Sequence, residues 1–188
     1  MRKIEISEKH IYCLEGNWNK NPRNSQSVKP ILELLNTSVG VKYIYRKCNT
    51  KEEFIEYLRQ YTFKRYQNYS ILYLAFHGRA NRICIRKEDI TLEEVAFVLK
   101  GKLKDKFIHF GSCSTLKTSE KNISNFITDT KCSFISGYRK NVGYLYSTAF
   151  ELLYFELLQK KKTYKQIEKT LKIQYAVFIN KLEFISVE

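Results

Sequence analysis

Short apolar segments alternate with segments of helical periodicity along this chain, and the alternation restricts the folds that it can adopt. The apolar segments are bounded by turn residues, which is typical of buried strands. They cover residues 10–14, 41–45, 70–76, 106–110 and 132–135. Strands separated by helices favour a parallel sheet that is covered on both faces. We therefore predict an α/β fold, a three-layer α-β-α sandwich with a mainly parallel central sheet.

The segments between these strands carry apolar residues at helical spacing, and several begin with a capping residue. Thr50 and Thr91 are each followed three residues later by a glutamate, which is the pattern of a capping box. Helices are predicted at residues 28–36, 51–61, 91–99, 123–128, 147–162 and 164–181, with a short hairpin around residues 82–86.

The composition is that of a folded protein. Hydrophobic residues make up 44% of the chain and aromatic residues 14%, which argues against extensive disorder. Two prolines and seven glycines are spread over the 188 residues, so that no segment resembles a linker. We predict a single domain over residues 1–188.

The formal charge of +14 comes from 33 Lys and Arg against 19 Asp and Glu. Such a charge fits nucleic acid, an anionic membrane or solubility alone. Most lysines are scattered, and no helix-turn-helix, zinc-finger or RNA-binding signature accompanies them. The pattern argues against nucleic acid as the partner and keeps a basic nucleic-acid-binding module only as an alternative.

Several features predict a cytoplasmic protein that does not contact a membrane. Residues 1–10 are too charged for a signal peptide, and no apolar run reaches the ~20 residues of a membrane span. The five cysteines are odd in number and lack CxxC spacing, which argues against a disulfide framework and a metal site.

Two of the predicted strands end in corners of small residues that carry reactive side chains. His77 and Gly78 follow the strand at residues 70–76, and Cys113 lies in the run Gly-Ser-Cys-Ser-Thr after the strand at residues 106–110. Functional side chains of parallel sheets collect at the carboxyl ends of strands. A histidine beside a cysteine activates the thiol as a nucleophile, and the nearby glycines permit close approach of backbone N–H groups to an oxyanion.

Phe-His-Gly at residues 76–78 and Phe-Gly-Ser-Cys-Ser-Thr at residues 110–115 resemble the motifs of the caspase-like cysteine peptidases. The looser pattern is most similar to that of the bacterial CHAT domains, since the caspase and metacaspase cysteine motifs are missing. The resemblance implies a caspase-like fold, with His77 as base, Cys113 as nucleophile, and the backbone N–H groups of Gly78 and Cys113 as oxyanion donors. It also implies a protein or peptide substrate, no cofactor, and restraint by an activating protein or small ligand in bacterial defence.

Two charged residues at other strand ends are candidates for substrate binding, with opposite consequences. In several caspase-like enzymes, acids at strand ends line the pocket for the residue before the cut. Glu15 would then favour a substrate Lys or Arg, although a loop acid or helix-cap partner is an equal alternative. Arg139 suits an acidic substrate residue or an anionic activator, although a solvated charge is an equal alternative. Trp18, in the long loop after the first strand, either covers the site or anchors that loop.

A non-enzymatic interpretation uses the same residues differently. His77 is then a structural histidine and Cys113 a small buried hydrophobe, in a catalytically silent domain that binds a partner or ligand through its strand ends. His109 alternates onto one face of its strand, where packing in the core is expected.

Overall fold

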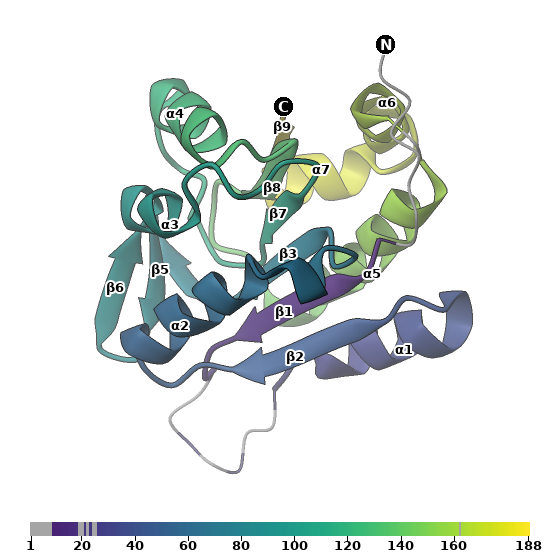
Figure 1. The fold of residues 1–188 in the computed structure, drawn as a ribbon. Coiled ribbons are helices and arrows are strands. Elements are labelled where there is room, and N and C mark those ends of the chain that lie inside the picture. Colours follow the sequence, from purple (N-terminus) through teal and green to yellow (C-terminus); the bar gives the residue numbers. More distant parts are fainter. Residues whose placement is uncertain (1–8, 19–20, 22, 24–25, 162) are drawn as a thin grey trace.

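The computed structural model describes residues 9–188 apart from residues 19–20, 22, 24–25 and 162. Its main element is a six-stranded sheet with the strand order β2-β1-β3-β7-β8-β9 (Figure 1). The strands are β1 (Ile11–Glu15), β2 (Tyr43–Lys47), β3 (Ile71–Ala75), β7 (Phe107–Phe110), β8 (Phe134–Tyr138) and β9 (Phe184–Val187).

Every neighbouring pair in this sheet is parallel except β8 and β9, which are antiparallel. The prediction of an α/β fold with a mainly parallel sheet is therefore confirmed. The strand β9 was not predicted. The fifth strand was predicted at residues 132–135, but the structure has it at Phe134–Tyr138. It continues through Gly137, where the sequence suggested a turn.

Helices cover both faces of the sheet, as a three-layer arrangement requires. One buried cluster joins the sheet to α2, α3 and α4, and the other joins its opposite face to α1, α5 and α6. The helices are α1 (Lys29–Val39), α2 (Lys51–Tyr61), α3 (Leu92–Leu99), α4 (Glu120–Thr130), α5 (Tyr144–Lys160), α6 (Tyr164–Gln174) and α7 (Ala176–Leu182), with a short 3-10 helix η1 (Lys64–Tyr66).

Three helices begin at the capping residue that the sequence indicated, whereas α1 begins after Val28 and α5 after Gly143 without a side-chain cap. Thr91 and Glu94 form the predicted capping box, and Thr163 caps α6. Thr50 caps α2, but the Glu53 carboxylate accepts from the N–H of Asn49 instead of Thr50. The predicted helix at residues 164–181 is two helices, which meet at Tyr175.

A small antiparallel sheet follows β3, with the order β4-β5-β6. Its strands are β4 (His77–Arg79), β5 (Arg82–Ile85) and β6 (Glu88–Thr91). The hairpin expected around residues 82–86 is thus part of a three-stranded sheet. His77 and Gly78, predicted as a corner, form its first strand.

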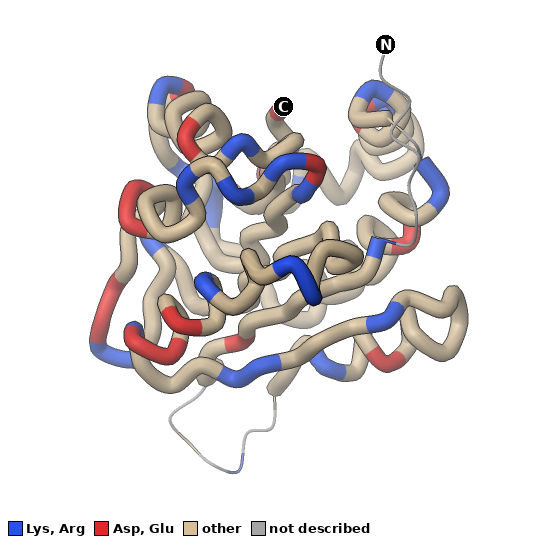
Figure 2. The backbone as a smooth tube through the Cα atoms, viewed as in Figure 1, with Lys and Arg blue, Asp and Glu red and all other residues tan. Residues whose placement is uncertain are grey.

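The strand register brings the carboxyl ends of β1, β3, β7 and β8 to one edge of the main sheet. Glu15 pairs with Ala75, and Leu74 pairs with Phe110, which in turn pairs with Gly137. The residues that follow these strands therefore lie near one another. Lys and Arg are spread over the whole described backbone (Figure 2). Within the described residues, no helix has the length and apolar character needed to cross a membrane.

Candidate active site

Gly78 brings the strand that carries His77 into direct contact with the loop that carries Cys113. A Cβ atom added at Gly78 would lie 2.5 Å from the backbone oxygen of Cys113 and 2.3 Å from Oγ1 of Thr115. Both distances are far below a van der Waals contact, so only glycine fits at this position. The two strand ends predicted to carry the reactive residues are neighbours in space.

The Cys113 loop is held from two sides by backbone hydrogen bonds. On one side, the N–H of Ser114 donates to the oxygen of Lys140 at 2.9 Å, and Ser114 takes a left-handed φ of 55°. On the other side, Oγ1 of Thr115 donates to the backbone oxygen of Arg82 at 3.0 Å, and the N–H of Asn81 donates to the oxygen of Thr115 at 3.2 Å. The loop is thereby fixed between the β4–β5 hairpin and the segment after β8.

The sulfur of Cys113 lies half-buried against the backbone of Val142. The N–H of Val142 donates to Sγ at 3.4 Å, and Sγ lies 3.6 Å from the oxygen of Val142. The two contacts hold the sulfur against the backbone of Val142, in the segment after β8.

His77 is exposed, and one of its ring nitrogens has a defined partner. Nε2 lies 2.8 Å from the backbone oxygen of Trp18. Because a carbonyl oxygen only accepts hydrogen bonds, Nε2 must carry the proton in the neutral ring. Nδ1 then holds the lone pair that a general base needs. The indole of Trp18 also packs edge-on against the His77 ring, with 5.4 Å between the ring centroids.

Glu15 is fully buried below the Trp18 loop and is surrounded by hydrogen-bond donors. Its carboxylate accepts from Nε1 of Trp18 at 2.5 Å, from Oγ of Ser27 at 2.6 Å, from the N–H of Val28 at 2.7 Å, and from the hydroxyl of Tyr45. The bond to Val28, directly before α1, is that of a helix-cap partner. Glu15 thus holds the loop that orients His77, and its binding of a substrate residue stays a prediction.

Arg139 follows β8 beside the Cys113 loop. Its N–H donates to the oxygen of Glu183 at 3.0 Å, and the N–H of Leu116 donates to the oxygen of the preceding Tyr138 at 3.1 Å. The Nε atom of Arg139 is buried without a hydrogen-bond partner among the described residues. This N–H group is therefore an enclosed donor that is unused among the described residues.

A second polar cluster lies inside the protein, on the α5 side of the sheet. Nδ1 of His109 lies 3.0 Å from Oγ of Ser136, and Nε2 lies 3.2 Å from Oε1 of Glu151. Glu151 also accepts from the hydroxyls of Tyr73 at 2.5 Å and Tyr138 at 2.9 Å. Burial, followed by the nearby Glu151 charge, holds the pKa of both tyrosines well above its usual range. His109 is enclosed as the sequence indicated.

No group of three or more metal-ligating side chains forms within the described part of the chain. Two residues that hold the site, Val142 and Thr115, were not identified from the sequence. Thr115 directly follows the cysteine motif, which is a usable signal, whereas Val142 reaches Cys113 only through the fold.

The profile of a family described as "Family of unknown function (DUF6642)" matches residues 8–185 of this chain. No curated protein matches it.

Proposed function

The chain belongs to the DUF6642 family, whose function is unknown, and we propose that it is a cysteine endopeptidase with a caspase-like fold. The observation that carries the proposal is the contact of Gly78 with the backbone of Cys113, because it joins the strand ends of a histidine and a cysteine. The tautomer that Trp18 imposes on His77 supports the same chemistry.

In the proposed reaction, Nδ1 of His77 takes the proton of the Cys113 thiol, and the thiolate attacks the carbonyl carbon of the substrate peptide bond. The resulting oxyanion accepts hydrogen bonds from the backbone N–H groups of Gly78 and Cys113. The N–H of Cys113 is suited to this because it donates no hydrogen bond to a described residue.

The tetrahedral intermediate then collapses, and the C–N bond breaks. The leaving amine takes its proton from the imidazolium of His77, and a thioester to Cys113 remains. A water molecule gives a proton to His77 as its oxygen attacks the thioester carbon. The second tetrahedral intermediate then collapses, and its C–S bond breaks. The carboxylic acid product leaves, and the imidazolium of His77 returns its proton to the sulfur, which restores the thiol of Cys113. No cofactor takes part in these steps.

For substrate binding we favour Arg139 over Glu15. The Glu15 carboxylate already accepts from four donors, whereas Arg139 has a donor without an acceptor. An acidic substrate residue or an anionic activator is the matching ligand. Restraint by a partner protein or small ligand, in bacterial defence, rests on analogy with caspase-like proteins alone.

The test is covalent labelling with peptidyl acyloxymethyl ketones, read by mass spectrometry of the modified peptide. We expect Cys113 to be labelled in the wild type, and labelling to be lost in Cys113→Ala and His77→Ala. Cys84→Ala is the matched control, since Cys84 is also half-buried and lies opposite His77 in the small sheet. If His77→Ala is labelled as fast as the wild type, the proposed dyad is wrong.

A further inference from the structure

The small sheet has one buried face and one open face, and the open face carries His77. Ile83 and Ile90 lie on the buried face, with 0% exposure. Residues alternate between faces along a strand. Arg79 therefore lies on the same face as His77, and the pairing of Arg79 with Arg82 places the second arginine there too.

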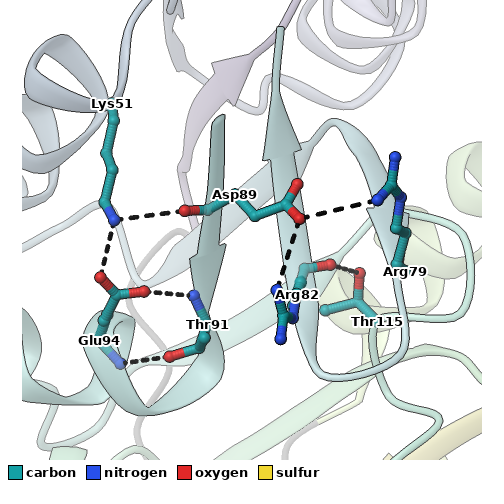
Figure 3. Close-up of polar contacts among 7 residues, drawn as sticks. All are labelled: Lys51, Arg79, Arg82, Asp89, Thr91, Glu94 and Thr115. Carbon is teal, nitrogen blue, oxygen red and sulfur yellow. Dashed lines mark hydrogen bonds and ion pairs between the residues drawn. The ribbon is translucent and has the colours of Figure 1, made fainter. Parts of the chain in front are cut away.

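The two arginines share a single carboxylate. Asp89, on β6, lies 3.9 Å from Nη1 of Arg79 and 3.7 Å from Nη1 of Arg82 (Figure 3). Both separations are too long for a hydrogen bond. The arginine side chains are 77% and 54% exposed. One carboxylate neutralises only one of the two positive charges, so the pair keeps a surplus charge.

The hydrogen-bonding capacity of the two guanidinium groups is unused within the described structure. Each guanidinium has five N–H donors in a planar fork that matches a carboxylate. Neither side chain donates a hydrogen bond to a described residue, and Asp89 holds both by charge alone. Such a pair can bind a second carboxylate, supplied by a ligand.

The backbone under this pair is firmly held. Lys51 on α2 donates to the backbone oxygen of Asp89 at 3.3 Å and to the carboxylate of Glu94 at 2.7 Å (Figure 3). This fixes β6 against two helices. Arg82 is held on the opposite side, because its backbone oxygen accepts from Thr115 in the Cys113 loop.

The same connections fix the arginines relative to both reacting residues. Arg79 follows His77 by two residues on one strand face, a separation of about 7 Å. Arg82 contacts Thr115, two residues after Cys113. A carboxylate bound by the pair would lie within a few residues of extended peptide from the sulfur of Cys113.

We propose that Arg79 and Arg82 form a subsite for an acidic side chain of the peptide substrate, separate from the position that Arg139 serves. The placement of the ligand as a substrate rests on the proposed peptidase function. The recognition of a carboxylate by this arginine pair does not depend on the peptidase function.

Binding tests the subsite without catalysis. We would titrate isotope-labelled Cys113→Ala protein with an eight-residue peptide of alternating Glu and Gly, following the side-chain Nε–Hε signals of both arginines. The control peptide has Gln in place of Glu. The Glu peptide is expected to bind at least about fivefold more tightly, with affinity that falls as salt is added.

Three variants assign that binding to the pair. Arg79→Gln with Arg82→Gln should remove the preference for the Glu peptide, whereas Arg86→Gln, at an exposed arginine of the neighbouring turn, should leave it unchanged. Asp89→Asn should raise affinity for the Glu peptide, because it removes the competing carboxylate. The subsite is refuted if both peptides bind alike, or if the double substitution leaves the preference intact.

Cleavage separates this inference from the proposed function. We would measure cleavage of internally quenched peptides that carry either Glu or Gln at one position near the cut, testing each position in turn. At one position other than the residue directly before the cut, the wild type should cleave the Glu peptide faster than the Gln peptide. The double variant should lose this preference. If the Glu peptide binds through the arginines but Cys113 is never labelled, the peptidase proposal fails and the anion site stands. If Cys113 is labelled and cleavage ignores Glu at every position, the subsite fails alone.

Discussion

His77 lies on β4 of the small sheet and His109 on β7 of the main sheet, and their surroundings differ in almost every respect. His77 is exposed and has a carbonyl partner on Nε2. His109 is 1% exposed, and both of its nitrogens have partners in Ser136 and Glu151. Aromatic rings also enclose His109.

The difference shows what makes a histidine available for proton transfer. A ring held at one nitrogen and open at the other has a fixed tautomer and a lone pair that can reach a substrate or a thiol. A ring held at both nitrogens is part of the packing. We therefore expect chemistry at the His77 region and stability from the His109 region.

Exchanging either histidine for alanine should separate these roles most clearly. In His77→Ala, alkylation of Cys113 by iodoacetamide should slow by about 10²–10⁴-fold, because the proposed base is lost. The free energy of unfolding should change by about 0.5 kcal/mol or less. In His109→Ala, unfolding in urea should be easier by about 3 kcal/mol or more, since Glu151 loses a buried partner.

Should His109→Ala fail to fold, His109→Gln keeps a donor for Glu151 and serves in its place. The comparison breaks down if substitution of His109 slows alkylation as much as substitution of His77 does while the unfolding midpoint stays unchanged.

Glu151→Gln probes the buried cluster without changing its shape. The new amide turns an N–H₂ group toward donors such as the Tyr73 hydroxyl, so the free energy of unfolding should fall by about 1–3 kcal/mol. Glu156→Gln, on the same helix and paired with Lys160 near the surface, is the matched control. It should change stability by about 0.5 kcal/mol or less. Equal effects of the two substitutions in chemical denaturation would contradict a buried role for the cluster.

Glu15→Gln tests whether the buried carboxylate orients the exposed histidine. Because Glu15 binds Trp18, and Trp18 binds His77, loosening the loop should slow alkylation of Cys113 by about tenfold. Glu33→Gln, at the exposed Lys29 pair on α1, should have no effect on the rate. An unchanged rate in Glu15→Gln, measured by mass spectrometry over time, would show that the loop position does not depend on this carboxylate.

Cys84 should contribute least, although it lies opposite His77 in the small sheet. Burial, followed by hydrogen bonding to Asp89, raises the pKa of the Cys84 thiol from 9.0 to about 11. A raised thiol pKa means that the thiolate appears only as pH rises toward that value. At pH 7.5, Cys84→Ser should therefore leave total alkylation within about twofold of the wild type. Rapid alkylation of Cys84 at that pH would contradict this assignment.

Local sequence patterns were sufficient for the elements that bury an apolar stripe. The strand at residues 106–110 and the helix at residues 51–61 were predicted because apolar periodicity and capping are local properties. The strands β4, β6 and β9 were not predicted. β4 consists of His77, Gly78 and Arg79, which have no apolar alternation, and β9 directly follows a helix without a turn signal of Gly or Pro.

The candidate site was predictable to the extent that it depends on strand order. His77, Gly78 and Cys113 follow neighbouring strands, and parallel pairing brings such ends together. The contacts of Trp18 with His77 and of Val142 with Cys113 depend on how two loops fold back over the sheet, which no local spacing encodes. The sharing of Asp89 by two arginines depends likewise on the register of a hairpin.

The antiparallel pairing of β9 with β8 has a consequence for the time during which the chain is made. At synthesis rates of about 5–20 residues per second, the residues of β9 are made about 2–10 seconds after those of β8. Until then, β8 presents a row of unpaired N–H and C=O groups, which is a template for pairing with other chains. The edge of β8 is thus open to such pairing while the chain is being made, and a truncation before Phe184 would leave it open permanently.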